Sequence, residues 1–327
     1  MKPTTRERID CQSHILSEEF VELLSKRTES PNIVSIDGQK FIMVNGWRRK
    51  LLPGLLDIDA KIRSMDQSGI SMAALSMNDP GPELFGKESL TIAAMNNDYI
   101  ADVVRRYPGR FFGLAALPYD TPENLLKEFE RSVNKLDMKG IMLFSNLDGH
   151  FPDEEPFRPL YAEAERRGVP IVLHPGRPMT LDVLKDYDMS TMLGMLFDTS
   201  IAMLRLILSG VMEDHPNLKI VCPHVGGTLP YLMGRIDYQV TAMKRGGDKI
   251  RHLPSEYLKR VWFDTVTQIP HAIRFAVDFM GADKLMYSSD HPWVQPPAII
   301  KAVDETPLTE AQRDRIYSGT ARELFGV

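Results

Sequence analysis

The stretch Leu285-Met-Tyr-Ser-Ser-Asp-His-Pro-Trp293 is a short apolar run that ends on an acid, Asp290, followed at once by an imidazole, His291. A glycine before the run and a proline near its end mark its limits, so the pattern predicts a β-strand with two polar side chains at its carboxyl end. In barrel enzymes the carboxyl ends of the strands carry the chemistry. A lone Ser-Asp-His is also typical of an aspartate that caps the next turn, which is the simpler explanation unless other strands end alike.

Two other apolar runs end in the same manner. They are Val169-Pro-Ile-Val-Leu-His-Pro175 and Leu218-Lys-Ile-Val-Cys-Pro-His224, and each reaches a histidine at its carboxyl end. In a parallel sheet the carboxyl ends of the strands lie along one edge, so these endings come close together. Three such endings in one chain therefore indicate a single site.

Strand and helix patterns alternate along the chain, which is typical of a parallel sheet. Eight strands alternating with helices favour a (β/α)8 TIM barrel, although a doubly wound open sheet gives nearly the same pattern. No Gly-x-Gly-x-x-Gly follows the first strand, which disfavours a dinucleotide-binding sheet. The predicted strands are 9–11, 70–76, 111–117, 139–144, 169–174, 218–223, 260–264 and 284–289. The predicted helices are 90–107, 122–136, 157–167, 201–212, 229–243, 270–280, 309–318 and 320–325.

The segment at about 17–56 has no clean period and is predicted to be an insertion over the active-site end of the barrel. Within it, residues 33–44 are expected to form a hairpin around Asp37-Gly38. A helix is predicted at 57–68, where apolar residues fall at helical spacing and a glycine follows. There is no internal repeat, low-complexity segment or proline-rich linker, so we predict that residues 1–327 form one domain.

The overall composition excludes several classes of protein. The chain has 327 residues, 43% of them hydrophobic, and its formal charge of −5 and pI of about 5.9 produce no field that attracts nucleic acid or an anionic membrane. The first eight residues have no apolar core of a signal peptide, and no run of about 18 apolar residues occurs, so we expect neither export nor a membrane span. Cys11 and Cys222 are too few for a disulfide framework and lie in apolar runs. We therefore expect a cytoplasmic protein that acts on a small molecule.

Four side chains that follow predicted strands have the chemistry of metal ligands. If the barrel is correct, they come after strands one, five, six and eight and lie on the carboxyl face. Imidazoles and a carboxylate that converge from separate strands form a pocket for a divalent cation, with a position left open for water or substrate. Any one of them alone is well explained as a core or capping residue, but four together favour a site. They are His14, His174, His224 and Asp290.

These residues belong to a set of short motifs in which the chain resembles the amidohydrolase superfamily. The resemblance is to the branch that is similar to 2-amino-3-carboxymuconate-6-semialdehyde decarboxylase, and it covers nearly the whole chain. Each motif is weak alone, but together they are specific. The motifs are Ile9-Asp-Cys-Gln-Ser-His14, Met65-Asp-Gln-Ser-Gly69, Gly113-Leu-Ala-Ala-Leu-Pro118, Leu173-His-Pro175, His224-Val-Gly-Gly-Thr-Leu-Pro230, Gly234-Arg235 and Ser289-Asp-His-Pro292.

The resemblance implies a fold, a cofactor and a reaction. The expected fold is a (β/α)8 barrel with one divalent metal ion, and the expected reaction is non-oxidative loss of CO2 from an aromatic or muconate-type carboxylic acid. By the resemblance, His14, His174 and Asp290 match metal-ligand positions, and His224 matches the catalytic imidazole. The binuclear branches of the superfamily use a lysine at the end of strand four, where this chain has Leu-Phe-Ser at 143–145, so a single metal is implied.

Gln12 departs from the family pattern, which usually begins with His-x-His after the first strand. A glutamine amide offers only a neutral carbonyl oxygen, a harder and weaker donor than imidazole, so zinc affinity should fall and Mn²⁺ or Mg²⁺ is favoured more than usual. Gln12 is nevertheless predicted as a metal ligand, through its carbonyl oxygen. The alternative is an amide that orients His14 without touching the metal, and a metal-poor site is also left open.

Arginine, histidine and aromatic side chains are candidates for binding the substrate. A guanidinium fork suits a carboxylate, and in related decarboxylases an arginine of the neighbouring subunit also reaches the site, so the resemblance implies a homodimer or higher homo-oligomer. Each arginine is equally well explained as a solvated surface charge, and aromatic residues at strand ends are often core. The candidates are Arg48, Arg49, Arg235, His291 and Trp293, with Trp47, Phe144 and Met77 as a possible apolar wall.

The residues alone indicate a metal-assisted lyase or hydrolase, and the resemblance narrows this to a decarboxylase. In that reaction the substrate carboxylate and an ortho oxygen bind the metal, while Asp290, helped by His224, protonates the carbon that loses CO2. One alternative is a hydrolase or hydratase of the same fold, in which a water polarised by His224 attacks a lactone or a double bond. The other alternative is a non-catalytic binding protein with a decayed metal site.

Overall fold

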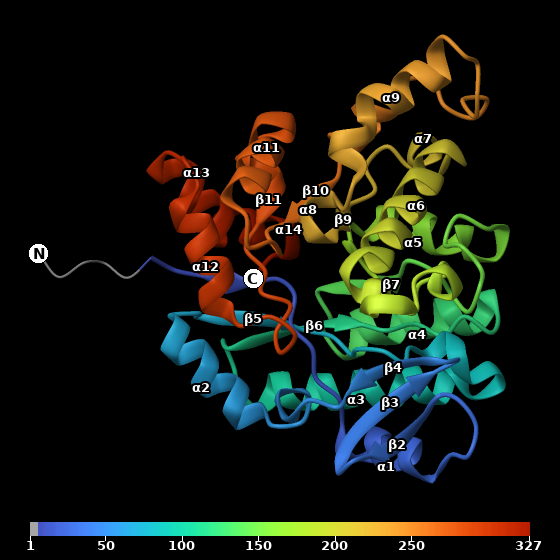
Figure 1. The fold of residues 1–327 in the computed structure, drawn as a ribbon, viewed down its shortest axis with the longest axis vertical. Helices are drawn as coiled ribbons and strands as arrows, with labels where there is room; N and C mark the ends of the chain where they lie inside the picture. Colours follow the sequence, from blue (N-terminus) through green and yellow to red (C-terminus); the bar gives the residue numbers. More distant parts are fainter. Residues whose placement is uncertain (1–5) are drawn as a thin grey trace, which may run out of the picture.

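Eight parallel strands form the main sheet of the computed structural model, which describes residues 6–327 (Figure 1). Each strand pairs in parallel with the next one, in the order β1-β5-β6-β7-β8-β9-β10-β11. The Cys11 N–H donates to the Tyr287 carbonyl oxygen at 3.0 Å, so the chain after β11 joins the chain after β1. This contact closes the sheet and confirms the predicted (β/α)8 barrel. The strands are β1 Ile9–Asp10, β5 Met72–Leu75, β6 Phe111–Ala115, β7 Gly140–Phe144, β8 Ile171–His174, β9 Ile220–Cys222, β10 Trp262–Asp264 and β11 Leu285–Met286.

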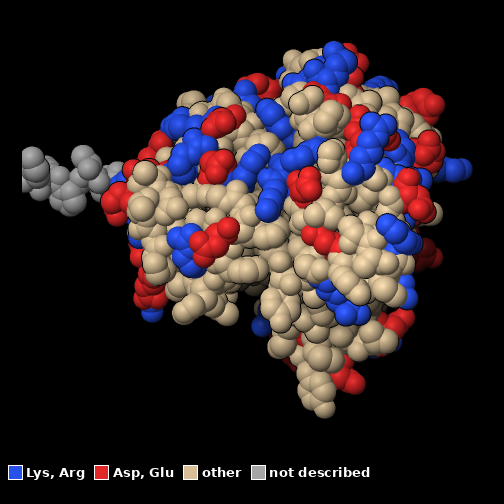
Figure 2. Space-filling view, turned by 90° about the horizontal axis from the view of Figure 1, so that it is seen from above, with Lys and Arg blue, Asp and Glu red and all other residues tan. Residues whose placement is uncertain are grey.

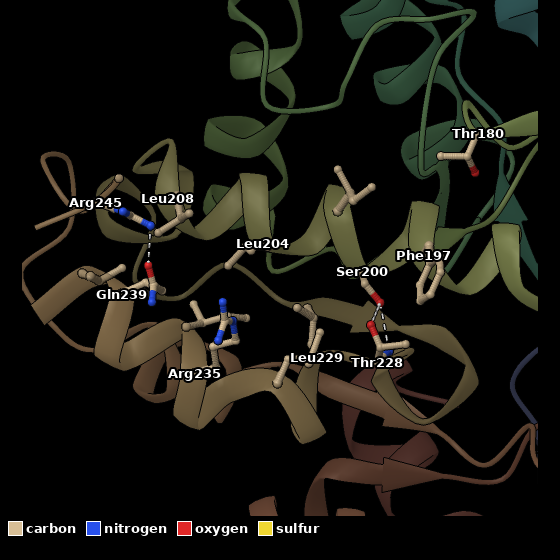
Figure 3. Close-up of a pocket in the computed structure, with 15 residues that line it drawn as sticks. Thr180, Phe197, Ser200, Leu204, Leu208, Thr228, Leu229, Arg235, Gln239 and Arg245 are labelled. Atoms are coloured by element: carbon tan, nitrogen blue, oxygen red, sulfur yellow. Dashed lines mark hydrogen bonds between the residues drawn. The ribbon is translucent and has the colours of Figure 1, made fainter. Parts of the chain in front are cut away.

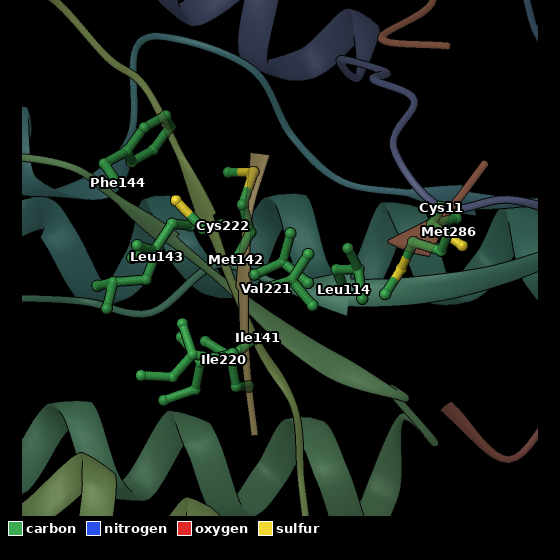
Figure 4. Packing of buried hydrophobic residues seen from close by; sticks show 14 of the residues in the cluster. Cys11, Leu114, Ile141, Met142, Leu143, Phe144, Ile220, Val221, Cys222 and Met286 are labelled. Atoms are coloured by element: carbon green, nitrogen blue, oxygen red, sulfur yellow. The ribbon is translucent and has the colours of Figure 1, made fainter. Parts of the chain in front are cut away.

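All eight predicted strands are present, and each is buried on both faces. In β7, Ile141 and Leu143 alternate with Met142 and Phe144, and all four are buried (Figure 4). Side chains of a strand point alternately to the barrel interior and to the surrounding helices. A strand that is covered on both sides consists of a continuous apolar run, which is why the sequence pattern located these strands.

Helices surround the barrel in the predicted alternation. The predicted helix at 57–68 is present as α2; the Asp57 carboxylate caps it by accepting from the Ala60 N–H at 2.8 Å, and Gly69 ends it at φ 64°. The prediction at 201–212 was wrong in one respect, because Gly210 at φ 86° divides this segment between α6 and α7. The helices are α2 Ile58–Ser68, α3 Ser89–Arg106, α4 Pro122–Lys135, α5 Arg158–Arg167, α6 Met195–Leu208, α7 Val211–Asp214, α8 Pro223–Gly226, α9 Leu229–Thr241, α10 Pro254–Leu258, α11 Pro270–Met280, α12 Pro296–Glu305, α13 Glu310–Asp314 and α14 Thr320–Phe325.

The predicted insertion forms a helix and a three-stranded antiparallel sheet (Figure 1). The expected hairpin is present, with Asp37 and Gly38 both at positive φ in its turn, but β4 was not predicted. Trp47 and Arg49 of β4 are buried, and the Arg49 guanidinium lies 3.8 Å from the ring centroid of Trp293, beyond β11. The insertion therefore covers the carboxyl end of the barrel, as expected. Its elements are α1 Glu18–Lys26, β2 Asn32–Ile36, β3 Gln39–Val44 and β4 Trp47–Lys50.

The sequence also predicted that the chain has no signal peptide, no membrane-spanning run and no strongly charged surface. The predicted lack of a signal peptide rests in part on residues 1–5, which lie outside the described residues. A helical stretch at 186–208 is long and apolar enough, by length and composition, to cross a membrane, and half of its most apolar 18-residue window is buried inside the protein. On the face seen in Figure 2, basic and acidic side chains are interspersed.

Candidate metal centre

Two imidazoles and one carboxylate converge at the carboxyl end of the barrel. His14 follows β1, His174 is the last residue of β8, and Asp290 follows β11. The Nε2 atom of His14 lies 3.0 Å from Nε2 of His174 and 3.0 Å from Oδ1 of Asp290. The Nε2 atom of His174 lies 3.8 Å from the same oxygen. Among the described residues, this is the one group of three or more His, Cys, Asp or Glu side chains with the spacing of a metal site.

The chemistry of the three donors fits a cation. The Nδ1 atom of His14 lies 3.2 Å from the Met77 carbonyl oxygen, which can only accept, and 3.0 Å from the Ser76 hydroxyl, which can accept as well as donate. Both contacts are satisfied when Nδ1 carries the hydrogen. In the neutral ring, Nε2 then presents a lone pair to a second imidazole nitrogen and to a carboxylate oxygen. These acceptor atoms repel one another unless a positive centre lies among them. Imidazole nitrogen and carboxylate oxygen are common ligands of zinc and manganese, and a backbone partner on the other ring nitrogen is usual for a metal-bound histidine.

The protonation states of the cluster also suit a metal. Burial alone would raise the pKa of Asp290, but the close imidazoles of His14, His174 and His224 hold that pKa well below its ordinary value. Burial and the neighbouring His14 lower the pKa of His174 to about 4. At neutral pH, Asp290 is thus a carboxylate and His174 is neutral, and these are the forms that bind metal ions.

Gln12, the predicted fourth ligand, lies beside this cluster. Its amide nitrogen donates to Oδ1 of Asp290 at 3.0 Å. Its carbonyl oxygen is buried and has no hydrogen-bond partner within residues 6–327. The amide therefore orients Asp290, and not His14 as the alternative supposed. The unpaired carbonyl oxygen keeps Gln12 as a predicted ligand, because a buried acceptor without a partner is unfavourable unless a donor or a cation meets it.

His224, the predicted catalytic imidazole, lies on the other side of Asp290. Its Nε2 atom is 3.8 Å from Oδ2 of Asp290. Burial lowers the pKa of His224, but the nearby Asp290 carboxylate and the charge of Asp264 raise it above the ordinary value of histidine. The ring is therefore protonated more readily than a free imidazole, which suits a group that supplies a proton.

Of the predicted substrate-binding arginines, the structure brings Arg49 to this end of the barrel. Arg49 is buried between the rings of Trp47 and Trp293, and its Nη1 donates to the Asp79 carboxylate at 2.5 Å. Its positive charge opposes, in small part, the rise in the pKa of His224. Arg49 thus lies within electrostatic reach of the cluster, with an acidic partner already in place.

The other predicted substrate-binding residues lie elsewhere or face other partners. Arg48 is exposed and lies over the ring of Phe41, on the opposite side of β4 from Arg49. Arg235 is exposed on α9 and lines a surface groove. His291 is buried, with its Nδ1 2.8 Å from Nζ of Lys61. In one chain, therefore, neither Arg48 nor Arg235 joins the cluster.

Two charged residues near the site were missed from the sequence. Lys61 is 1% exposed, and burial lowers its pKa to about 7. Asp264 is 1% exposed, and burial raises its pKa to about 6. Each had a signal: Lys61 falls on the apolar face of α2, four residues before Met65, and Asp264 ends β10 as His174 ends β8. An ionisable residue in such a position indicates a polar site within the core.

Several known proteins are similar to this chain over nearly its whole length. Residues 9–327 match the protein family described as Amidohydrolase. A 2-amino-3-carboxymuconate-6-semialdehyde decarboxylase of Dictyostelium discoideum is 28% identical over 335 residues, which cover 98% of this chain and 92% of the relative. A gamma-resorcylate decarboxylase of Rhizobium radiobacter is 32% identical over 314 residues, which cover 88% of this chain and 93% of the relative. The crystal structure of a dihydroxybenzoic acid decarboxylase from Polaromonas, with bound manganese and the inhibitor 2-nitroresorcinol, has a TM-score of 0.82 at 26% identity and covers 98% of this chain and 97% of that one.

Replacing His174 by alanine is expected to remove most of the bound metal, because it deletes one of three converging donors. The wild-type protein should hold one equivalent of divalent metal per chain, measured by elemental analysis after reconstitution. His215→Ala is the control, since the His215 ring lies 3.0 Å from the Glu165 carboxylate and outside the cluster. Two equivalents in the wild type, or unchanged metal in His174→Ala, would contradict this assignment.

Gln12→His is expected to raise zinc affinity by about tenfold or more, because imidazole is a better zinc donor than an amide carbonyl. Competitive titrations with a chromophoric chelator compare the two proteins. Gln12→Glu provides a second comparison, since it keeps the size and adds a charged oxygen. Equal zinc affinity of the wild type and both variants would show that Gln12 does not face the metal.

Proposed function

This chain belongs to the amidohydrolase family, and from that membership we propose that it is a metal-dependent decarboxylase of an aromatic or muconate-type carboxylic acid. The observation that carries the proposal is the convergence of His14, His174 and Asp290, with His224 beside them, on the carboxyl face of the barrel. The three similar proteins described above are all named decarboxylases, that is, carboxy-lyases. Their lengths match this chain almost from end to end, so the comparison covers the whole site.

The reaction needs a positive centre and a proton donor. A divalent ion held by His14, His174 and Asp290, with Gln12 as a further proposed donor, would supply the positive charge that binds the substrate carboxylate and an ortho oxygen. We propose manganese or magnesium in preference to zinc, because Gln12 offers oxygen where the family usually has imidazole. The manganese in the Polaromonas relative supports this choice.

The side chains of this chain then move one proton. His224, whose pKa is raised, would supply that proton from Nε2, which lies 3.8 Å from the Asp290 carboxylate. We assign Asp290 as the group that passes the proton to the carbon bearing the carboxylate. When this carbon gains the proton, the ring loses conjugation. The carbon–carbon bond to the carboxylate then breaks, its electron pair returns to the ring, and CO2 leaves.

Arg49 is proposed to orient the substrate at the edge of this site. Its guanidinium is stacked on Trp293 and is paired with Asp79, so it is held rigidly and its charge is largely balanced before any substrate arrives. A rigid guanidinium fork can hydrogen-bond a substrate oxygen without a large loss of side-chain entropy. Trp293 offers an apolar ring that suits an aromatic substrate.

We also propose that the predicted homodimer forms through an apolar groove between α6 and α9 (Figure 3). The groove has a volume of about 640 Å³, and α9 projects beyond the rest of the barrel (Figure 1). Tyr231 and Leu232 of α9 are 85% and 36% exposed. Exposed apolar surface of this kind marks a contact site. The apolar walls include Phe197, Ile201, Leu204, Leu229, Leu232 and Ile236.

The charges at the two ends of the groove favour a second copy of this chain as the occupant. Thr180 borders one end, next to an exposed segment at 182–188 with three aspartates and one lysine. Arg245 borders the other end, in a segment at 244–251 with four basic residues and one aspartate (Figure 3). A two-fold axis across the groove would place the acidic end of each chain on the basic end of the other. Arg235 lines the same groove and does not join the cluster of its own chain. Its predicted contact with substrate would therefore have to be made in the dimer, at the site of the other chain.

The single-domain organisation and the cytoplasmic location remain proposals. Cys11 and Cys222 are both buried free thiols. Free thiols of this kind are usual in proteins of reducing compartments.

The proposed reaction is tested by CO2 release from a panel of hydroxybenzoates and muconate-type acids with the manganese-loaded enzyme. Substrates with a hydroxyl or keto oxygen ortho to the carboxylate should react, and isomers without that oxygen should not, because only the former present two oxygens to the metal. The His174→Ala variant is the control. Turnover of a lactone or an unsaturated acid without CO2 would support the hydrolase or hydratase alternative, and metal binding with no turnover of any compound would support a binding protein.

Asp290→Asn is expected to lower the decarboxylation rate by about 10² to 10⁴-fold, because it removes the titratable acid while keeping an oxygen donor of the same size. The variant should still bind metal and substrate, although more weakly. It should also fail to exchange the ring hydrogen of the product with solvent deuterium, since that exchange is the reverse of the protonation step. Exchange at the wild-type rate would show that the proton reaches carbon from His224 without Asp290.

Leu232→Asp is expected to convert a dimer to a monomer, because it places a charge on the apolar wall of the groove. Ile36→Asp is the matched control, since Ile36 is 38% exposed on β2 and lies outside the groove. Light scattering coupled to size-exclusion chromatography measures the mass of all three proteins. A monomeric wild type, or a Leu232→Asp variant with the wild-type mass, would contradict the proposed interface.

A further inference from the structure

The segment that carries His224 has an unusual backbone. His224, Val225, Gly226 and Gly227 all have positive φ, at 54°, 56°, 76° and 63°. Residues with a Cβ atom rarely adopt this left-handed region, and β-branched residues such as valine do so least of all. Two of these four residues therefore hold an unfavourable conformation, which persists only when the surroundings impose it.

The Asp264 carboxylate supplies the contacts that impose this conformation. Its Oδ1 atom accepts the N–H of His224 at 2.7 Å and the N–H of Val225 at 3.3 Å. The N–H of Val266 donates to the same oxygen at 3.0 Å. Successive backbone N–H groups in such a turn form a concave site for an anion, and here the anion belongs to the protein itself. Asp264 is buried at the end of β10, which pairs with β9 just before the segment.

The glycines of the segment fit it closely against its neighbours. A Cβ atom on Gly226 would lie 2.5 Å from the Phe263 ring, and one on Gly227 would lie 2.5 Å from Oγ of Ser200. The backbone is thus pressed against both β10 and α6. Because the main chain is fixed on these two sides and by Asp264, the His224 side chain is directed towards Asp290.

We propose that Asp264 is a positioning residue, whose carboxylate captures the N–H groups of His224 and Val225 and so holds the His224 imidazole 3.8 Å from Asp290. The carboxylate has no hydrogen bond to any member of the metal cluster within the described part of the chain, so it acts through His224. As a contribution to catalysis this role rests on the proposed function, in which His224 relays the proton. As a structural role it does not depend on the reaction.

A double-mutant cycle with the manganese-loaded protein tests the catalytic part. Asp264→Ala should lower kcat by about 10²-fold, the lower range for misplacing a proton-transfer group, with KM within about threefold of the wild type. In the His224→Ala background the same change should have almost no further effect, because the group that it positions is absent. Equal losses in the two backgrounds, or no loss in the wild type, would overturn the proposal.

Two further variants provide a milder change at Asp264 and a control at another buried carboxylate. Asp264→Asn keeps an acceptor oxygen of the same size, so it should lose only about three- to tenfold in kcat, and only when His224 is present. It replaces Asp264→Ala in both backgrounds if the alanine variant does not fold. Glu128→Gln is the control, because it changes a buried carboxylate that lies away from the site. Glu128 belongs to α4 and accepts a hydrogen bond from the Asn97 side chain at 2.7 Å. The kcat of this variant should remain within about twofold of the wild type in either background.

A crystal structure of the Asp264→Ala protein, or of Asp264→Asn, tests the structural part without any activity. The expected result is that His224 and Val225 leave the left-handed region and that the imidazole moves away from Asp290. An unchanged segment would overturn the proposal whatever the reaction is. If the segment relaxes while no compound in the panel releases CO2, the proposed function fails and the positioning role of Asp264 stands.

Discussion

The backbone pairing between residues 12–14 and residues 290–291 is the contact on which the rest of the structure depends. The Asp290 N–H donates to the Gln12 carbonyl oxygen at 2.9 Å, and the His14 N–H donates to the His291 carbonyl oxygen at 2.9 Å. These two bonds join the first strand to the last, so they complete the barrel. They also fix the positions of His14 and Asp290, two of the three residues whose side chains meet in the cluster. Closure of the fold therefore brings these two residues together, although they lie at opposite ends of the chain.

The barrel and its central residues could be predicted because their signals are local. A parallel strand buried on both faces produces a continuous apolar run, and all eight runs became strands. His14, His174, His224 and Asp290 were recognised because each directly follows or ends such a run. The sequence did not decide which of Arg48 and Arg49 faces the site, since only the alternation along β4 makes Arg49 buried and Arg48 exposed. That alternation could not be read from the sequence, because nothing local showed β4 to be a strand.

Residues whose role depends on distant partners could not be predicted. Lys61 is buried because it meets His291, which lies 230 positions away in the sequence. Asp264 is important because its carboxylate meets the backbone of residues 224 and 225, and hydrogen bonds to backbone groups leave no trace in the sequence pattern. Arg235 would meet a substrate only through the proposed dimer. For Lys61 and Asp264 the determining contact is tertiary, and for Arg235 the proposed contact is quaternary, whereas periodicity describes only the local chain.

The central claim is that His14, His174 and Asp290 hold one catalytic divalent ion. Diffraction from crystals soaked with manganese and 2-nitroresorcinol, measured at the manganese absorption edge, tests it most directly. The account predicts one anomalous peak per chain, bordered by Nε2 of His14, Nε2 of His174 and the Asp290 carboxylate, with the oxygens of the inhibitor against it. No peak at this position, a second peak of equal height beside it, or inhibitor bound elsewhere on the chain would contradict the account.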